Sequence, residues 1–255
     1  MSQDEKLIKE INQALKNSTI LRKNKNFVDR ISFMKENMKD NKAFVFNKGK
    51  DIEYFLSKFK NYRDKWNDQP NGCVKKKLLS NDLKKKNISP LSIDIEVSAF
   101  CDLACPFCFR EAIVTPDKII DEQFCYKLID QAAEMEVPSI KFNWRGEPLL
   151  HPKISNFISY AKKKGIIDTI INTNATHLTA KKSEELIKSG LDYIIYSFDG
   201  GTKKTYEKMR PGRFKKNNFD TIFANIKKFK EAKEKLNSKF PYTKIQMIIT
   251  HETVN

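Results

Sequence analysis

Residues 92–108 read SIDIEVSAFCDLACPFC, a short β-branched run followed by three cysteines. The alternation of apolar and polar residues predicts a β-strand, and the cysteines then fall on the loop at its carboxyl end. Three thiols on one loop can bind three corners of an iron–sulfur cluster, whereas a structural zinc site needs a fourth ligand. We therefore expect an iron–sulfur site after this strand. Zinc with a distant fourth ligand, or cysteines without a ligand role, are the alternatives.

Downstream of this stretch, strand-like runs alternate with amphipathic helical segments. The expected strands are 92–98, 139–144, 166–173, 191–198 and 243–250. The expected helices are 121–136, 154–164, 180–189 and 219–236. This alternation predicts parallel strands joined by right-handed crossovers. The fold class is therefore α/β, a partial (β/α) barrel of the TIM type with parallel strands.

The first 88 residues differ from the rest because they lack strand-like alternation. Apolar residues at helical spacing predict helices around Leu7–Leu15, Phe27–Met34 and Ile52–Phe59. A turn is expected at Asp68–Gly72, and the lysine runs 75–77 and 84–86 predict a solvated linker. We thus expect a helical N-terminal extension with a basic linker over residues 1–88, and the barrel over residues 89–255.

The chain carries 48 basic and 32 acidic residues, a net charge of +16. Such a surplus can indicate nucleic-acid binding. Only seven of the basic residues are arginine, however, and nucleic-acid sites favour the bidentate fork of arginine over lysine. Nucleic acid is therefore not the expected partner.

No apolar run approaches the roughly 20 residues of a membrane helix, and the polar start lacks the apolar core of a signal peptide. The expected location is the cytoplasm, without membrane attachment.

Three further polar motifs follow the ends of later predicted strands. They are Asn143-Trp-Arg-Gly-Glu-Pro148, Asn172-Thr-Asn-Ala175, and Ser197-Phe-Asp-Gly-Gly201 with Tyr206-Glu-Lys-Met-Arg210 after it. Each motif alone is compatible with an ordinary turn. In a parallel β/α barrel the working residues lie at the carboxyl ends of the strands. The cysteine loop and these motifs are therefore expected to share one rim.

The spacing C-x3-C-x2-C, with the aromatic Phe107 before the last cysteine, resembles the signature of the radical S-adenosylmethionine (radical SAM) superfamily. The resemblance implies one [4Fe–4S] cluster held by Cys101, Cys105 and Cys108, with S-adenosylmethionine on the iron left open. One electron from the reduced cluster would cleave this cofactor, and the 5′-deoxyadenosyl radical would take a hydrogen atom from the substrate. A small electron donor of the flavodoxin or ferredoxin type is implied as a partner.

The other motifs resemble the cofactor-binding segments of the same family. Residues 145–148 are similar to its Gly-Gly-Glu-Pro turn, whose backbone and acid hold the methionine ammonium, although Arg145 stands where the first glycine is usual. Residues 172–175 resemble its Thr-Asn-Gly segment. Residues 197–210 resemble a Ser-x-Asp-Gly segment, whose serine contacts the cofactor ribose, and whose arginine pairs with the cofactor carboxylate. The implied cofactor-binding residues are Phe107, Gly146, Glu147, Asn174, Ser197 and Arg210.

The substrate is not written in these motifs. The Ser-x-Asp-Gly resemblance favours a peptide or protein side chain, or a small metabolite such as a sugar intermediate. An RNA-modifying radical enzyme stays open because residues 1–88 carry 22 basic against 11 acidic residues. A non-catalytic iron–sulfur protein for electron transfer or sensing is the third possibility, and it would normally use four protein ligands.

Three further expectations concern the chain end and single residues. Barrels of this family usually have six β/α units, often followed by a SPASM or twitch domain with auxiliary clusters, so an incomplete barrel without that domain is expected. Cys125 lies on an apolar helix face and Cys73 lies in the predicted turn region, so neither is expected to bind the cluster. Trp144 is expected to be a packing residue and not a substrate clamp, with a position on the rim as the alternative.

Overall fold

The computed structural model describes residues 29–47, 50–77, 88–113 and 116–253, together with Lys9 and Asp82. The helix predicted around Leu7–Leu15 and the lysine run 84–86 lie outside these residues. Within the described part of the chain, no helix is long and apolar enough to cross a lipid bilayer.

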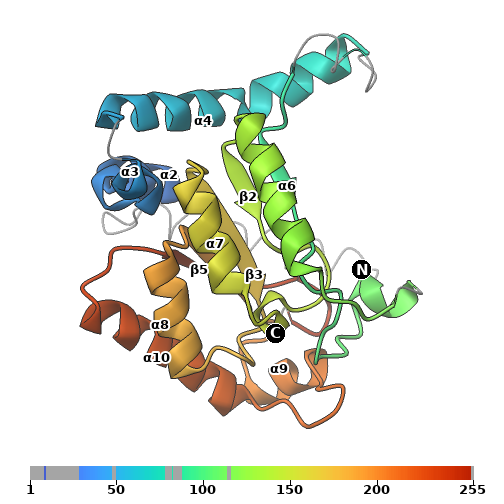
Figure 1. Cartoon of the computed structure of the whole chain (residues 1–255). Helices are drawn as coiled ribbons and strands as arrows, with labels where there is room; N and C mark the ends of the chain where they lie inside the picture. The colour runs from blue at the N-terminus through green and yellow to red at the C-terminus, as the bar shows by residue number, and fades with distance from the viewer. Residues whose placement is uncertain are drawn as a thin grey trace.

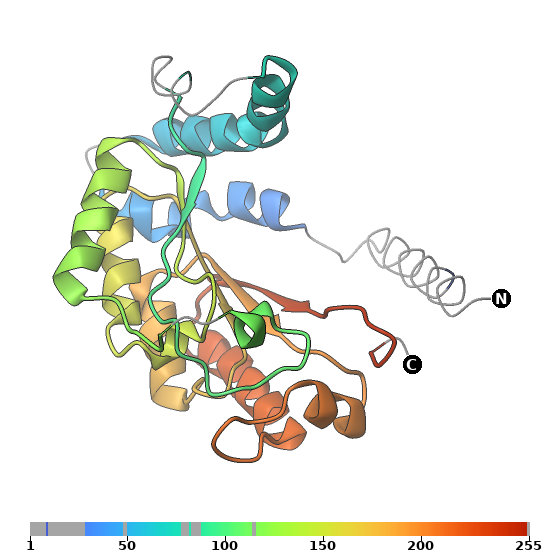
Figure 2. The same ribbon diagram turned by 90° about the vertical axis from the view of Figure 1, so that its right-hand side faces the viewer.

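Five parallel strands form one sheet in the order in which they occur in the sequence. They are β1 (Ser92–Asp94), β2 (Ser139–Lys141), β3 (Asp168–Thr173), β4 (Tyr193–Ser197) and β5 (Tyr242–Gln246). The connections contain α6 (Glu122–Glu134), α7 (Ile154–Lys163), α8 (Ala180–Ser189), α9 (Lys203–Met209) and α10 (Phe219–Lys235). Helices α6, α7 and α8 stand side by side on one face of the sheet (Figures 1 and 2). The predicted partial (β/α) barrel is confirmed.

Local capping explains why the helix bounds agree closely with the predicted ones. The side chains of Asp121, Thr179 and Asn218 accept hydrogen bonds from backbone amides in the first turns of α6, α8 and α10. Helix α8 ends at Gly190, whose left-handed backbone (φ 86°) suits glycine. The short helix α9 was not predicted, because seven residues show too little periodicity.

The predicted strands 92–98, 139–144 and 243–250 were too long at their carboxyl ends. After β1 the chain leaves the sheet, and residues 97–99 pair with residues 118–120 in the antiparallel sense. The amide of Ile120 donates to the carbonyl of Val97 at 3.1 Å, and that of Ala99 donates to Lys118 at 2.8 Å. The alternation of apolar residues thus continues past β1, but the backbone here forms one isolated bridge with a different partner.

The turn predicted at Asp68–Gly72 is wrong, because these residues lie inside α4 (Ile52–Lys75). Pro70 has no amide hydrogen to donate to the helix, but the helix continues to Lys75 and changes direction towards this end (Figure 2). Asp51 caps the start of α4 by accepting from the amide of Tyr54 at 2.8 Å. The helix predicted around Ile52–Phe59 is confirmed.

Helices α2 (Arg30–Glu36), α3 (Lys42–Phe46) and α4, with the short 3-10 helix η1 (Met38–Asp40), lie at the edge of the sheet where the strands begin (Figure 1). They enclose a second apolar core that includes Ile167 and Phe240, the residues just before β3 and β5. The other members of this core are Met34, Met38, Ala43, Phe55, Phe59 and Tyr62. The main core lies between the sheet and α6, α7, α8 and α10.

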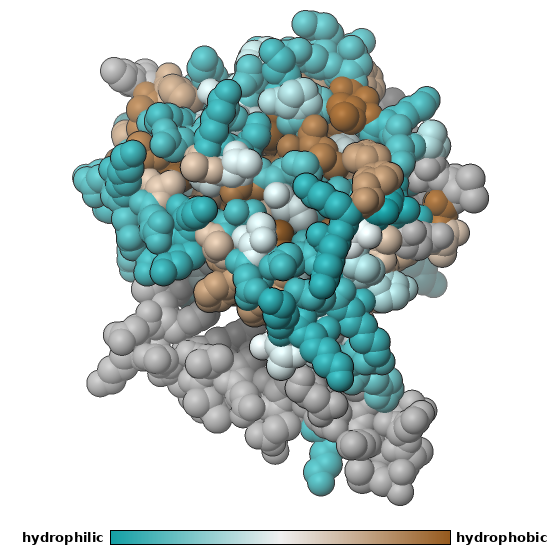
Figure 3. All heavy atoms as spheres, turned by 90° about the horizontal axis from the view of Figure 1, so that it is seen from below, coloured by the Kyte–Doolittle hydropathy of each residue, from teal (hydrophilic) through white to brown (hydrophobic). Residues whose placement is uncertain are grey.

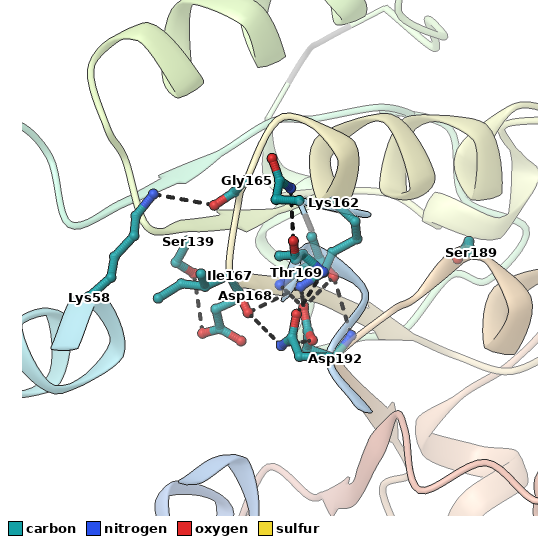
Figure 4. Close-up of polar contacts among 12 residues, drawn as sticks. Lys58, Ser139, Lys162, Gly165, Ile167, Asp168, Thr169, Ser189 and Asp192 are labelled. Atoms are coloured by element: carbon teal, nitrogen blue, oxygen red, sulfur yellow. Dashed lines mark hydrogen bonds and ion pairs between the residues drawn. The ribbon is translucent and has the colours of Figure 1, made fainter. Parts of the chain in front are cut away.

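A buried polar network joins these helices to the sheet (Figure 4). Lys162 of α7 donates to Asp192 at 2.5 Å, and Asn41 donates to the other oxygen of Asp192 at 2.9 Å. Arg30 of α2 forms an ion pair with the buried Asp168 of β3. Burial raises the pKa of Asp192 and lowers the pKa of Lys162, while their mutual attraction opposes both shifts. The extension is therefore tied to the sheet by buried polar groups as well as by apolar packing.

Candidate cofactor site

A hollow of about 280 Å³ opens at the carboxyl ends of the strands. This is the edge opposite α2, α3 and α4, and the usual place for chemistry in a β/α barrel. The structure brings every residue singled out in the sequence to this hollow. They are Cys101, Cys105, Phe107, Cys108, Gly146, Glu147, Asn174, Ser197 and Arg210.

The cysteine loop begins soon after β1, and its thiols are at least partly buried and unpaired. Burial and the nearby Glu147 carboxylate raise the pKa of Cys101 to about 12. Burial also raises the pKa of Cys105 to about 11, although the positive charge of Arg210 acts in the opposite direction. These thiols hold their protons at neutral pH. Bound iron would supply the positive charge needed to displace those protons.

The donor set fits a cluster with three protein ligands. Cys125 is buried in the main core and Cys73 lies on α4, so neither lines the hollow. Among the described residues, no three His, Cys, Asp or Glu side chains gather around a single metal ion. A cubane cluster does not require the three thiolates to converge on one metal ion, because each thiolate binds a different iron. A mononuclear zinc site is the poorer fit.

Gly146 brings the turn after β2 against the start of the cysteine loop. Its backbone is left-handed, with φ +60°. A Cβ atom at Gly146 would lie 2.2 Å from the carbonyl oxygen of Ser98 and 2.7 Å from that of Phe100. The amide of Glu147 donates to the same Phe100 carbonyl at 2.8 Å. Only glycine allows this approach, so the turn and the cysteine loop are held together through their backbones.

Arg145 forms a partly buried ion pair with Glu96, two residues after β1. The arginine Nε and Nη2 donate to the two carboxylate oxygens at 2.7 and 2.6 Å, and this pairing lowers the pKa of Glu96. The Arg145 guanidinium carbon also lies 4.9 Å from the centre of the Trp144 ring. Trp144 is 60% exposed, so the expected packing role is wrong and the alternative, a position on the rim, is the one observed. It lines the hollow beside Arg145 instead of entering the core.

Glu147 is buried, with 1% of its surface exposed. One carboxylate oxygen accepts from the Thr173 hydroxyl at 2.7 Å and from the Leu149 amide at 3.0 Å, and the other accepts from the Asn174 amide at 2.8 Å. Burial raises the pKa of Glu147 to about 7 despite these bonds. A cation in the hollow would favour the charged carboxylate, as the ammonium group of a methionine moiety would.

Asp102 is a site residue that sequence reasoning missed. Its carboxylate accepts from Nδ2 of Asn174 at 2.9 Å and lies 3.4 Å from Nε2 of His177. Asn174 Nδ2 is also 3.9 Å from the sulfur of Cys101. Asp102 therefore joins the cysteine loop to the segment after β3. An aspartate between two cysteines carries no signal of this pairing in the sequence.

Asp199 was also missed, although it is the third residue of the Ser-x-Asp-Gly segment. Arg210 donates to it from Nε at 2.7 Å, and Nη2 lies 2.5 Å from the same oxygen. Both side chains are buried. The guanidinium carbon of Arg210 is 6.0 Å from the Phe107 ring centre. Arg210 thus lines the hollow as half of a buried ion pair, not as an isolated cation.

The model of the Radical SAM superfamily matches residues 95–252, which contain this whole site. The chain belongs to the radical SAM superfamily. The cofactors of this family are a [4Fe–4S] cluster and S-adenosylmethionine, and the relatives similar to this chain are enzymes.

Two curated relatives illustrate the range of that family. The chain is 36% identical over 107 residues to a GTP 3′,8-cyclase of Chlorobaculum tepidum, and this match covers 42% of this chain and 32% of the relative. It is 29% identical over 121 residues to a PqqA peptide cyclase of Gluconobacter oxydans, and this match covers 47% of this chain and 33% of the relative. The matches thus span about a third of the length of these relatives.

Solved structures show the same fold. The structure of anSMEcpe with bound AdoMet gives a TM-score of 0.51 at 19% identity, covering 62% of this chain and 43% of that chain. Streptococcus suis SuiB bound to S-adenosylmethionine gives 0.51 at 21% identity, covering 80% and 40%. At these identities the likeness concerns the fold alone.

Proposed function

We propose that this protein cleaves S-adenosylmethionine reductively, and that the resulting 5′-deoxyadenosyl radical takes a hydrogen atom from a peptide or protein side chain or from a small metabolite. The observation that carries the proposal is the gathering of three thiols and three cofactor-binding motifs around one hollow. The enzyme would work in a reducing compartment such as the cytoplasm, because its site needs free thiols.

Each group has a task that its position allows. Cys101, Cys105 and Cys108 would hold the cluster and leave one iron without a protein ligand. Glu147, whose pKa burial raises, would gain a charge partner from the methionine ammonium. Arg210 would offer its remaining N–H groups to the cofactor carboxylate, with Asp199 fixing its orientation. Ser197 would contact the ribose.

The relatives support both substrate classes, since one is named for a nucleotide and the other for a peptide. An electron-transfer or sensing protein is less well supported, because it would not need Glu147 and Arg210 at its cluster. An RNA substrate is also less well supported. The described N-terminal helices lie at the opposite edge of the sheet from the hollow.

The test is cofactor cleavage by anaerobically reconstituted protein reduced with dithionite. Chromatography should detect 5′-deoxyadenosine and methionine, even without substrate. Replacing Cys101, Cys105 or Cys108 by alanine should abolish both products and the iron–sulfur absorbance.

Cys125→Ala and Cys73→Ala are the matched controls. Each should keep iron content and cleavage, with about 1 kcal/mol of stability lost for the buried Cys125. Loss of the cluster in either control would identify a fourth protein ligand and contradict the proposal. A loaded, reducible cluster that yields neither product would favour electron transfer.

A further inference from the structure

The loop after α9 is attached to the backbone of the cysteine loop. The amide of Ala104 donates to the carbonyl of Pro211 at 2.9 Å, and the amide of Arg213 donates to the carbonyl of Asp102 at 2.8 Å. Nε of Arg213 donates to the carbonyl of Cys101 itself at 3.3 Å. The backbone of Cys101, the first expected cluster ligand, is therefore hydrogen-bonded directly to this loop.

An aromatic pair makes a second link between the two loops. Phe214 stacks on Phe100, with ring centres 5.7 Å apart and planes 15° from parallel. Phe100 immediately precedes Cys101. Phe214 is 69% exposed, the largest exposed fraction of any Phe or Trp among the described residues. It therefore offers a contact surface one residue away from the cluster site.

Phe100 and Phe214 line a second hollow of about 590 Å³, which adjoins the cofactor hollow because Leu103 lines both. Phe100 and Asp102 line this second hollow, whereas Cys101 between them lines the first. The loop lies at the lower edge of the molecule in Figures 1 and 2, on the side that Figure 3 shows, where apolar side chains are scattered among hydrophilic ones. The cysteine loop thus has two accessible sides.

Two exposed lysines, Lys215 and Lys216, line this second hollow, against one acid, Asp102, which accepts from Asn174 and lies 3.4 Å from His177. Residues 211–219 read PGRFKKNNF, with three cations and no acid. Arg213 is directed at backbone carbonyls of the cysteine loop, whereas Lys215 and Lys216 are exposed. Lys216 reaches Glu207 only at 3.6 Å, with 80% of its side chain exposed. An apolar spot with a cationic rim complements a partner that carries acidic side chains around a small apolar centre.

We propose that Phe214, Lys215 and Lys216 form the docking surface for a small acidic electron-transfer protein of the flavodoxin or ferredoxin type. The donor loses one electron and the cluster gains it, and no atom is transferred. A donor on this side leaves the cofactor hollow free for substrate. This inference rests on the proposed function, because it concerns the reduction of the same cluster.

Lysines also attract the phosphates of RNA. The redox protein is favoured, because Phe214, Lys215 and Lys216 line the second hollow and not the cofactor hollow. An RNA base to be modified would have to enter that hollow. The exposed cations are also lysines and lack the fork with which arginine grips phosphate.

The first test measures the binding of an FMN-loaded flavodoxin to the metal-free protein by fluorescence anisotropy. Lys215→Glu/Lys216→Glu should weaken binding at least tenfold, and wild-type binding should fall steeply with added salt. The matched control is Lys227→Glu/Lys228→Glu on α10, which changes the net charge equally at exposed positions outside this loop. Equal losses in both double variants would refute the docking surface. The docking surface would also be refuted if Lys215→Glu/Lys216→Glu lowered the affinity for a single-stranded RNA but left the affinity for flavodoxin unchanged.

The second test compares reductants for cofactor cleavage. With reduced flavodoxin the Lys215/Lys216 variant should be at least tenfold slower than the Lys227/Lys228 variant. Reduced methyl viologen is a cation, which lysine repels and glutamate attracts. With this reductant the Lys215/Lys216 variant should be no slower than the Lys227/Lys228 variant. Equal rates with flavodoxin would overturn the docking proposal alone. Failure of wild type with both reductants would overturn the proposed function, while the anisotropy comparison would still decide the docking surface.

Discussion

Gly146→Ala should disrupt the contact between the turn after β2 and the cysteine loop. A non-glycine residue in the left-handed conformation costs about 1–2 kcal/mol. The added Cβ would also overlap the backbone of Ser98 and Phe100, at 2.2 and 2.7 Å from their carbonyl oxygens. Forced overlap in a packed region adds about 1–3 kcal/mol. We therefore expect a total loss of about 2–5 kcal/mol, a large part of a typical domain's stability.

Gly165→Ala is the control that separates these two costs. Gly165 is also left-handed, with φ +86°, but a Cβ there would meet no atom within 4 Å. It should lose only the backbone contribution of about 1–2 kcal/mol. Urea unfolding of the metal-free proteins gives the stabilities, and iron content after reconstitution gives cluster loading. Gly146→Ala should be the less stable variant and should bind less iron. Equal stability and iron content in the two variants would refute the close-approach argument.

Three further predictions concern charged groups at the site. Glu147 should make the metal-free protein less stable as pH rises from about 4.5 to about 7, because the folded state keeps a proton that the unfolded state has released. The expected loss in the free energy of unfolding is about 3 kcal/mol. Glu147→Gln should remove this pH dependence, as measured by urea unfolding at a series of pH values. Arg210→Ala should destabilise by about 3–5 kcal/mol because it leaves Asp199 buried without a cation, with only the Ile248 amide among the described residues still donating to it. Adding Asp199→Asn should restore part of this loss, and additive losses in a double-mutant cycle would contradict the pairing. Arg145→Gly introduces the usual glycine of the family. It should lower the stability slightly through the lost pair with Glu96 and leave iron content unchanged. A loss of iron would give Arg145 a role at the cluster.

Periodicity predicted the strands, the four longer helices of the barrel and the edge at which the site lies. It could not predict where each strand leaves the sheet. Residues 97–99 keep the alternating pattern of β1 but pair with residues 118–120, a partner distant in sequence. The turn expected around Pro70 failed for a related reason, because a proline indicates a helix break only when the surrounding structure does not sustain the helix.

The nine site residues were proposed from motifs, and the structure gathers them around one hollow, while their roles toward the cofactor stay predictions. What the motifs did not contain are the partners that orient them. Asp102 and Asp199 act through contacts 72 and 11 residues away in sequence. Such pairings depend on the fold, and a single sequence does not display them. The boundary at residue 88 also stays a prediction.

The buried network at the beginning of the strands has a consequence for how this protein has evolved. Arg30 of the extension neutralises Asp168 of the sheet, and Asn41 bonds to Asp192. A descendant whose N-terminal helices still packed here but lacked a cation at position 30 would keep a buried carboxylate without its cation, at a cost of several kcal/mol. Exchange of the N-terminal helices therefore requires either a cation at the position of Arg30 or a change at Asp168, whereas Asp192 keeps Lys162 of α7 as its cation. Asp168 should record which type of extension a lineage carries, even where the extensions themselves have diverged too far to be aligned.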